Sequence, residues 1–550
     1  MSVNQQTNRI IMTEDNKENE HVSDSIPAKK RNIKAILSLL LLGITALLFL
    51  LALFFFIFDE TMNDPAKSHA FGILIMLASM ICLVVWFLIF SKRKLKVKLI
   101  ALAIVLGIGV TLFFTLEIRG WYGGLIPDVR LKGSKSKPDP LDNLLGDKNG
   151  SLEGPSSLQF RANAARDGIY EGDELDPDWA ANPPKELWRI KIGEGLGGFA
   201  IQGNFTVLSE KRDDDIYIVC YDTKTGQPRW FYKDSSVINH SFNIGGEGPR
   251  STPCIEDGKL YDMGVSGSLI CLDLKTGKKI WQESIYKYIG VDAEGDKDNI
   301  SWGRSGSPLI YKDFVIVPGG GNGDKTTSLL AFDRLTGELK WRGGSEQASY
   351  ASPQVLKLNE IEQIVIVNES SVSGHNPDNG DVLWEIKHKG RSTSNANASQ
   401  VVQVSSNGII VSKGYGKGSK LFELSKVGDQ WTSKEVWHQR SNLRTKFSSA
   451  VFTDEGNVIG LSESYLQCVD SKTGEEIWKG ESYGYGQVIR RGKHILVLSE
   501  KGKLAIVSAK TGEELGKIEA LKGKTWSTPA LAGNLIFLRN SSELVCYELK

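Results

Sequence analysis

The sequence has almost no net charge and very little histidine. Its 66 lysines and arginines balance 65 acidic residues, so the formal charge of the 550-residue chain is +1. A chain without a basic surplus has no global field that would favour nucleic acid or an acidic polymer. The seven histidines show no metal-ligand spacing with one another or with cysteine, which argues against a zinc site. We therefore expect no nucleic-acid partner and no bound structural metal.

Charged residues are nearly missing from three long stretches before residue 120. Residues 35–58, 71–90 and 99–118 each form an apolar run long enough to cross the ~30 Å hydrocarbon core of a membrane as a helix. The first run follows a polar tail, is too long for the core of a signal peptide and lacks a small-residue cleavage site, so it predicts an uncleaved anchor. We expect a disordered cytoplasmic tail over residues 1–34 and a three-helix membrane anchor over residues 35–118.

Basic residues in the flanks of these runs predict their orientation. The tail before the first run and the loop between the second and third runs are rich in lysine and arginine, and the positive-inside rule places both in the cytoplasm. The residues concerned are Lys29, Lys30, Arg31 and Lys34 in the tail, and Lys92, Arg93, Lys94, Lys96 and Lys98 in the loop. Arg119, Arg130 and Lys132 after the third run argue weakly against this placement, but a large following domain contributes little to the rule. The sequence thus predicts a multi-pass protein of the inner (cytoplasmic) membrane, whose residues after 118 face the periplasm or the outside.

Residues 119–159 are predicted to form an extracytoplasmic linker. Residues 133–157 in particular are rich in Gly, Ser, Pro, Lys and Asp and have no apolar periodicity, which is typical of a solvated tether. Such a segment gives the following domain reach, and we expect its removal to change the stability of that domain very little.

A short pattern, Asp-x-x-Thr-Gly-x-x-x-Trp, recurs after the linker. An Asp or Asn at the start of such a turn can accept hydrogen bonds from backbone amides two or three residues on, and Gly accepts the positive φ that closes a hairpin. Clear copies are residues 222–226 with Trp230, 273–277 with Trp281, 333–337 with Trp341 and 470–474 with Trp478; weaker ones are 376–380 with Trp384 and 508–512, where Gly516 replaces the tryptophan. Spacings of roughly 40–60 residues are typical of propeller blades. The aspartates are therefore expected to form turns rather than to act as catalytic acids.

The repeat count predicts the fold class. Units begin near Gly198, Ser251, Gly306, Ala351, Ala398, Ser448, Gly486 and Ser527, but the last unit ends at Lys550 with only three strands. Residues 185–192 contain Trp188 and belong to no unit, so we expect them to supply the missing strand and close the ring, which removes the sheet edges of an open arc. The predicted fold is an all-β eight-bladed propeller over residues 160–550, preceded by three transmembrane α-helices.

The cysteines follow the same repeat. A position that Ala331 fills in one unit, two residues before the turn opens, holds cysteine in four others: Cys220, Cys271, Cys468 and Cys546. We expect small buried core residues that the repeat keeps apart, and no disulfides between them. Cys82 lies in a predicted membrane helix, and Cys254 has no assigned role.

Two glycine-rich segments look like nucleotide-binding loops. Residues 193–198 match Gly-x-Gly-x-x-Gly, and residues 319–326 loosely resemble a phosphate-binding loop. Both are flanked by strand patterns, whereas a phosphate site of this kind needs the start of a helix. We therefore interpret both segments as structural loops.

One set of residues forms the best candidate binding site. Innermost strands line the axis of a propeller, so the residues just before them should converge at the mouth of the central channel, where binding residues are often found. Seven units supply one such residue each: Arg250, Arg304, Tyr350, Asn397, Lys446, Tyr485 and Trp526. Arginine, lysine and aromatic rings together suit an anionic or planar ligand. The alternative is a water-filled mouth without a ligand.

The repeat resembles that of the pyrroloquinoline-quinone (PQQ) propellers, a family that includes quinoprotein alcohol and sugar dehydrogenases and the non-enzymatic outer-membrane assembly lipoprotein BamB. More narrowly, the chain is similar from residue 160 to residue 550 to membrane-anchored PQQ-like proteins of planctomycete-type bacteria. The motifs that carry this likeness are residues 160–163, 166–168, 187–188, 245–253, 446–449, 483–487 and 523–526. A match of fold does not transfer an activity.

The resemblance leaves two functions open. The first is a non-catalytic propeller that binds a protein, a peptide or a cell-envelope polymer, with no cofactor. The second is a PQQ-dependent alcohol or sugar dehydrogenase that passes electrons to the membrane, with calcium held by residues such as Glu194 and Glu247 and with a carboxylate base that the sequence does not identify. Many periplasmic quinoprotein alcohol dehydrogenases carry a disulfide between adjacent cysteines, and no two cysteines are adjacent here. Membrane-bound quinoprotein glucose dehydrogenases lack that pair too, so the second function stays open.

Overall fold

The computed structural model describes residues 26–57, 65–133, 138, 141, 150–235, 245–389 and 396–550. The chain divides into two compact units, residues 1–61 with 67–113 and residues 62–66 with 114–550. Most of the predicted tail lies outside the described residues. Its end is helical, because α1 begins at Ile26; the residues there include good helix formers such as alanine, lysine and arginine.

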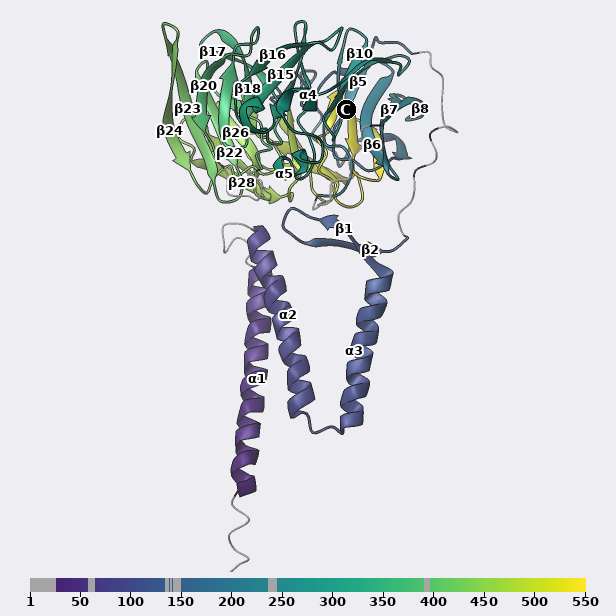
Figure 1. Cartoon of the computed structure of the whole chain (residues 1–550), viewed down its shortest axis with the longest axis vertical. Helices are drawn as coiled ribbons and strands as arrows, with labels where there is room; N and C mark the ends of the chain where they lie inside the picture. The colour runs from purple at the N-terminus through teal and green to yellow at the C-terminus, as the bar shows by residue number, and fades with distance from the viewer. Residues whose placement is uncertain are drawn as a thin grey trace, which may run out of the picture. The chain divides into compact units, whose positions relative to one another are not determined.

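The first unit is built from three apolar helices, α1 (Ile26–Ile57), α2 (Pro65–Phe90) and α3 (Leu95–Thr115) (Figure 1). All three are long and apolar enough to cross a membrane, with mean hydropathies of 3.0, 3.0 and 2.5. The α1 and α2 helices are joined by a hydrogen bond of 2.9 Å from Trp86 Nε1 to Ser38 Oγ. The predicted third span ended at residue 118, but the helix ends at Thr115 because a strand begins at the next residue.

The start of the predicted linker is folded. Residues of β1 (Leu116–Trp121) pair antiparallel with β2 (Pro127–Leu131), and the two form a hairpin. The end of the linker is folded too, since β3 (Ser156–Ser157) pairs with the first strand of the following sheet. In addition, the amide of Asn204 donates to Ser151 O at 2.9 Å. The C-terminal end of residues 133–157 therefore contacts the first sheet and is not a free tether.

Besides the two-stranded hairpin, the described part of the second unit contains eight antiparallel sheets. Each has four strands, and β3 adds a fifth strand to the edge of the first sheet. In seven of them the four strands are consecutive in the chain. These are β5 (Ala200–Gln202), β6 (Phe205–Arg212), β7 (Asp215–Asp222) and β8 (Pro228–Asp234); β9 (Cys254–Glu256), β10 (Lys259–Met263), β11 (Ser268–Asp273) and β12 (Lys279–Ser284); β13 (Leu309–Tyr311), β14 (Phe314–Gly320), β15 (Thr327–Asp333) and β16 (Leu339–Gly343); β17 (Gln354–Leu358), β18 (Ile361–Val367), β19 (Ser371–His375) and β20 (Val382–Lys387); β21 (Val402–Gln403), β22 (Gly408–Lys413), β23 (Gly418–Val427) and β24 (Gln430–Gln439); β25 (Val451–Phe452), β26 (Asn457–Ser462), β27 (Tyr465–Asp470) and β28 (Glu476–Ser482); and β29 (Gln487–Arg491), β30 (His494–Leu498), β31 (Lys503–Ser508) and β32 (Glu514–Glu519). Two one-turn helices, α4 (Tyr286–Ile289) and α5 (Asp296–Asn299), follow β12, and the 3-10 turn η3 (Gly323–Lys325) follows β14.

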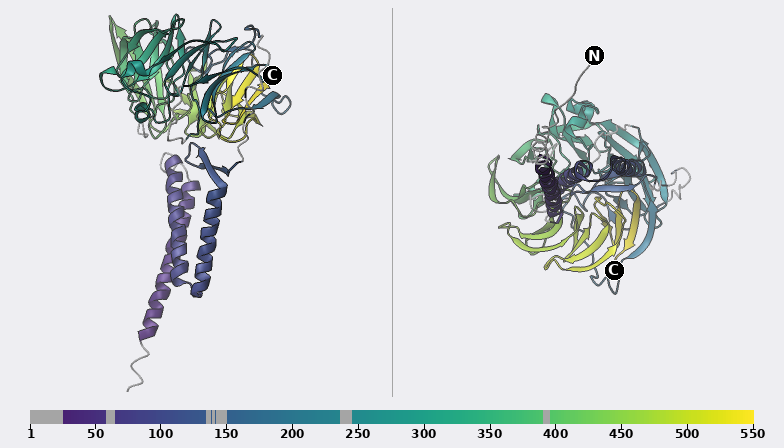
Figure 2. Two further views of the ribbon diagram at one scale, coloured as in Figure 1. Left: turned by 45° about the vertical axis from the view of Figure 1, so that its right-hand side comes forward. Right: turned by 90° about the horizontal axis from the view of Figure 1, so that it is seen from below.

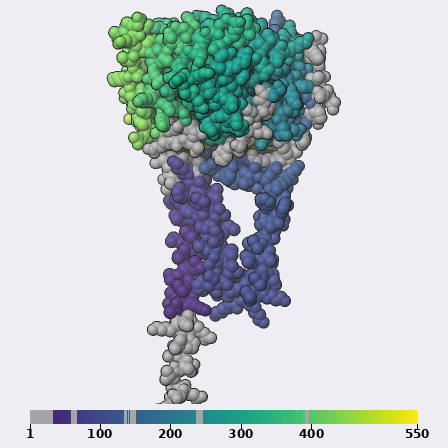
Figure 3. All heavy atoms as spheres, viewed as in Figure 1, coloured from purple at the N-terminus to yellow at the C-terminus, as the bar shows by residue number. Residues whose placement is uncertain are grey.

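The last sheet joins the two ends of the domain. Its strands are β33 (Ala530–Ala532), β34 (Leu535–Arg539) and β35 (Glu543–Glu548), and the fourth is β4 (Lys185–Lys191) from before the first sheet. The register places Trp188 opposite Cys546. The prediction that residues 185–192 complete the last unit is thus confirmed. Seen from one end, the sheets lie around a common axis (Figure 2), and from the side they present a continuous packed surface (Figure 3).

Apolar side chains fill the spaces between neighbouring sheets. One such cluster joins Ile201 and Val219 of the first sheet to Phe537 and Cys546 of the last. Both faces of an inner strand such as β7 are buried for this reason, and the burial explains why its sequence is apolar without alternation. The core is therefore divided among the contacts between successive sheets.

The recurring tryptophan carries much of the contact between sheets. Trp230 lies against Gly277, in the turn of the next sheet, and its Nε1 donates to Leu274 O in that turn at 2.8 Å. Trp188 likewise lies against Gly226 and donates to Thr223 O at 3.0 Å. Within the turns, the amide of Thr276 donates to Asp273 Oδ1 at 2.9 Å, so the aspartates form turns as predicted. The repeat therefore encodes both a hairpin and the surface on which the preceding tryptophan packs.

The repeat cysteines lie opposite these tryptophans. Cys220, Cys271, Cys468 and Cys546 are buried, belong to the third strands of four different sheets and have free thiols. Ala331 faces Trp341 in the same way. In these units a small side chain faces the indole ring of the neighbouring strand, whereas Leu421 faces Trp437 in the fifth sheet. The predicted repeat position of the cysteines is confirmed.

One unit lacks the tryptophan, and a residue from far upstream replaces it. Gly516 takes the position on β32, and a Cβ on that glycine would meet Trp179 Cβ at 2.6 Å. Trp179 is buried in the cluster that joins the last two sheets, with Leu504 and Ile506. The glycine thus leaves room for an indole that arrives from another part of the chain.

Candidate functional site

Three of the seven predicted mouth residues form one cluster. Lys446 Nζ lies 4.7 Å from the centre of the Tyr485 ring and 5.6 Å from that of Phe447. The Phe447 ring lies 4.7 Å from the Trp526 ring and 5.7 Å from the Tyr485 ring. A lysine held over aromatic faces gains cation–π stabilisation, which increases when water is excluded. Lys446, Tyr485 and Trp526 therefore come together as predicted.

The tip of the β1–β2 hairpin occupies this cluster. The amide of Gly123 donates to Glu500 Oε1 at 2.6 Å, and Lys446 Nζ donates to Gly123 O at 3.4 Å. Glu500 Oε1 also accepts a hydrogen bond of 2.8 Å from Trp526 Nε1. A Cβ at Gly123 would overlap the ring of Tyr485, so only glycine fits at this position. The mouth residues therefore bind a turn of this chain's own backbone.

A second lysine completes the contact. Lys524 Nζ donates to Trp121 O of the hairpin at 3.4 Å and to Gly245 O at 2.5 Å, and it lies 4.9 Å from the Trp526 ring. Burial lowers the pKa of Lys524 to about 8, because an ammonium group loses hydration there. The carboxylates of Asp128 and Glu500 and the carbonyl groups of Trp121 and Gly245 compensate part of that cost.

The side chains of the other four predicted residues contact neighbouring loops. Arg304 makes a two-pronged ion pair with Asp296, with both N–O distances 2.9 Å, and donates to Gly319 O at 2.5 Å. Asn397 Nδ2 donates to Asn368 O at 2.7 Å. Arg250 donates to Gly246 O at 3.0 Å, and burial lowers its pKa to about 10. Tyr350 lies 5.2 Å from the Trp302 ring, centre to centre.

The charged residues of this set are buried or partly buried. Lys446 is only 6% exposed and Arg304 only 5%, and Arg250 is partly buried. Their polar groups meet backbone carbonyls, a carboxylate or an aromatic ring of this chain, and a buried charge needs such partners. Double replacement of Arg250 and Lys446 would therefore also remove contacts within the fold, so it would not separate binding from stability.

Sequence reasoning missed the carboxylates of the site. Glu463 Oε2 accepts a hydrogen bond of 3.1 Å from Tyr485 Oη, and Glu500 holds the hairpin. Both belong to a Leu-Ser-Glu triplet that ends the second strand of a sheet, at residues 461–463 and 498–500; a third copy ends at Glu210, whose Oε2 accepts from the amide of Gly193 at 2.8 Å. This repeated triplet is the sequence feature that could have revealed them.

The two residues suggested as calcium ligands both lie beside Lys211. Glu247 forms an ion pair with Lys211, and Lys211 also pairs through its backbone with Glu194. Among the described residues, no group of three or more histidine, cysteine, aspartate and glutamate side chains is arranged to hold a metal ion. Hard cations such as calcium take six to eight oxygen ligands. The described residues therefore supply no preformed calcium site of their own, and PQQ with calcium stays part of the alternative function.

Replacing Gly123 by alanine should release the hairpin from the mouth. The new methyl group would overlap the Tyr485 ring, and such overpacking typically costs ~1–3 kcal/mol. Limited proteolysis of the 116–131 segment should accelerate roughly tenfold, while the melting of the sheets changes little. Gly109→Ala is the matched control, because a Cβ there meets no atom within 4 Å and neither Gly109 nor Gly123 has a positive φ. Equal cleavage rates for both variants and the wild type would contradict this description of the contact.

Comparisons with known proteins agree with the repeat. A family profile described as outer membrane protein assembly factor BamB matches residues 179–283, 242–480 and 462–549. Among curated proteins, the chain is 29% identical to the quinohemoprotein alcohol dehydrogenase of Comamonas testosteroni over 24% of this chain and 18% of that one. It is 27% identical to BamB of Xanthomonas campestris pv. campestris over 19% of this chain and 24% of that one. The matched regions thus span less than a quarter of either relative.

Solved structures agree in fold. A europium-containing methanol dehydrogenase superposes with a TM-score of 0.55 at 12% identity, over 74% of this chain and all of that one. The quinohemoprotein alcohol dehydrogenase of Comamonas testosteroni superposes with a TM-score of 0.51 at 13% identity, over 72% of this chain and 80% of that one. Identities this low are evidence for the propeller fold alone. The family profile matches the chain along nearly the whole ring of sheets. The chain therefore belongs to the PQQ-like repeat family described as outer membrane protein assembly factor BamB.

Proposed function

We propose that this protein is an eight-bladed PQQ-like propeller that three transmembrane helices hold at the inner membrane, and that it binds a protein or a cell-envelope polymer without catalysing a reaction. One observation carries the proposal: the polar groups that converge at the mouth are engaged by this chain's own backbone. Glu500, Lys446 and Lys524 all contact the hairpin. A surface that already accommodates a polypeptide turn suits a binding protein better than a small-substrate enzyme.

The ligand-binding role of Arg250, Arg304, Tyr350, Asn397, Lys446, Tyr485 and Trp526 stays a prediction. The geometry favours a polypeptide as occupant of the part lined by the last three. Their aromatic faces and the lysine suit the glycine-containing turn that the hairpin presents. A partner segment of the same chemistry would have to displace the hairpin, which makes the hairpin an internal competitor.

A quinoprotein dehydrogenase is the alternative, and the names of several relatives favour it. Ultraviolet-visible spectra of the purified protein after addition of PQQ and Ca²⁺, with a dye-linked assay on alcohols and sugars, separate the two functions. We expect no saturable change in the PQQ spectrum and no turnover. Turnover that requires both PQQ and Ca²⁺ would overturn the proposal.

The orientation is a proposal from the charges in the flanking loops. A periplasmic reporter enzyme fused after Gly133 should be active, and one fused within residues 91–98 should be inactive, because the five basic residues of that loop favour the cytoplasm. The opposite pattern of reporter activity would place the propeller inside the cell.

A further inference from the structure

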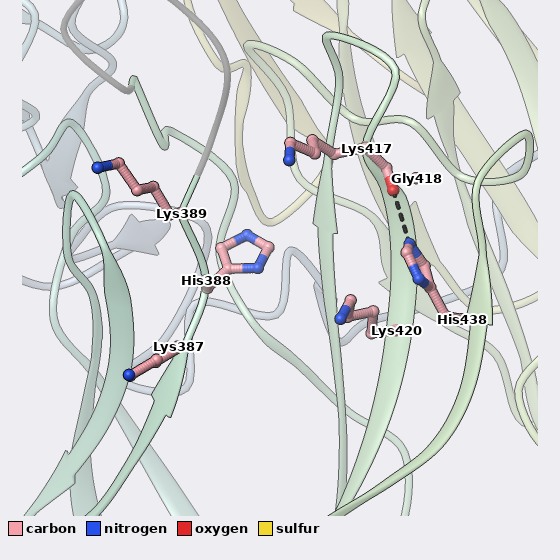
Figure 4. Close-up of a pocket in the computed structure, with 7 residues that line it drawn as sticks. All are labelled: Lys387, His388, Lys389, Lys417, Gly418, Lys420 and His438. Atoms are coloured by element: carbon pink, nitrogen blue, oxygen red, sulfur yellow. Dashed lines mark hydrogen bonds between the residues drawn. The ribbon is translucent and has the colours of Figure 1, made fainter.

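A basic pocket lies in the propeller outside the mouth. It has a volume of about 130 Å³ and lies where the end of β20 faces β23 and β24. The residues that line it are Lys387, His388, Lys389, Lys417, Gly418, Lys420 and His438 (Figure 4). This volume is about ten times the ~10–15 Å³ that one water molecule needs. The pocket can therefore hold an ion of several heavy atoms.

The lining has one sign of charge. Four lysines and two histidines contribute to it, and none of the described residues that line it is acidic. Glu435, which does not line the pocket, pairs with one of these lysines, with its Oε2 2.6 Å from Lys420 Nζ. Like charges that share a partly enclosed site destabilise one another unless an anion compensates them. Consistent with that, burial and the neighbouring Lys417 lower the pKa of Lys413, just beside the pocket, to about 7.

The pocket also contains an unsatisfied polar atom. His388 Nε2 is buried and has no hydrogen-bond partner among the described residues. Burial and the surrounding lysines keep this ring uncharged at neutral pH, with a pKa of about 3. By contrast, His438 Nε2 is 3.0 Å from Lys417 O. A buried nitrogen without a partner costs ~1–3 kcal/mol, so a ligand that accepts its hydrogen bond would be stabilised.

We propose that this pocket binds a phosphate-type oxyanion, either free or as the terminal group of a phosphate ester. Lysines provide point charges suited to such a group, and the His388 ring can supply a directed N–H. The proposal does not depend on the function proposed above, because the pocket and the mouth share no residue.

Isothermal titration of the full-length protein in detergent with inorganic phosphate and, separately, with glycerol 3-phosphate tests the proposal. We expect saturable binding of at least one of them, and tighter binding of the ester would identify an esterified phosphate as the ligand. The double variant Lys387→Gln with Lys420→Gln should weaken binding at least tenfold, and His388→Phe should weaken it severalfold.

The matched control removes two lysines from other sheets. Lys233 and Lys340 are surface residues in ion pairs with Asp215 and Asp333, so Lys233→Gln with Lys340→Gln should leave the affinity unchanged while lowering the net charge equally. Melting curves check that each variant is folded. Absence of saturable binding to the wild type, or equal weakening by both double variants, would overturn the pocket assignment.

Discussion

Deleting residues 185–192 should lower the melting temperature of the propeller more than any single substitution does. The last sheet would lose β4, which pairs with β35 from Lys185 to Lys191, together with the contact between Trp188 and the turn of the first sheet. Loss of a large buried aromatic alone costs ~3–5 kcal/mol, against a typical net stability of ~5–15 kcal/mol. Thermal unfolding followed by circular dichroism measures the effect.

Two point variants make this test quantitative. Trp188→Ala should lower the free energy of unfolding by ~3–5 kcal/mol. Leu187→Ala, one residue earlier on the same strand, should lower it much less, because Leu187 is 38% exposed and Trp188 only 9%. If the deletion and the intact protein melted at the same temperature, the ring would not depend on β4 for its closure.

Replacing Gly277 by alanine should be far more destabilising than the same change at Gly428. Both glycines have a positive φ, +68° and +62°, so both variants carry the ~1–2 kcal/mol strain of a left-handed residue. At Gly277 the added Cβ would also lie 2.5 Å from Trp230, whereas at Gly428 it would meet nothing within 4 Å. Overpacking adds ~1–3 kcal/mol at the first site only.

The difference between the two variants isolates the contact between sheets. Denaturant unfolding should give a total loss of ~2–5 kcal/mol for Gly277→Ala and ~1–2 kcal/mol for Gly428→Ala. A double variant, Gly277→Ala with Trp230→Ala, should cost less than the sum of its parts, since the overlap disappears with the indole. If Gly277→Ala and Gly428→Ala lost the same free energy of unfolding, the glycine in the turn would be needed only for its positive φ.

The repeat could be predicted from the sequence because its determinants are local. Asp273 accepts from an amide three residues on, and Gly277 closes the same turn. The closing strand was predictable as well, since Trp188 matched the repeat without belonging to a unit. Each of these features is determined by about ten consecutive residues. The apolar strands on either side of each turn then predict the rest of the sheet.

The contacts at the mouth could not be predicted in the same way. Gly123 and Glu500 are separated by 377 residues, and no local pattern relates a glycine in a short hairpin to a glutamate near the C-terminus. Trp179 is a similar case, because it occupies the place left by Gly516 without any repeat of its own. Lys446, Tyr485 and Trp526 come together as predicted, but the hairpin that covers them belongs to a segment that the sequence predicts to be a linker.

Closure by β4 sets a time order for folding during synthesis. The strand is made early, and its partner β35 follows roughly 350 residues later. At ~5–20 residues per second the ribosome needs ~20–70 s for that distance. Until then β4 is an unpaired strand that can pair with another copy of the chain, a known hazard of exposed strand edges. Pairing of β4 with a nascent chain on a neighbouring ribosome therefore competes with closure of the ring. Slower synthesis of the second half of the propeller prolongs that competition.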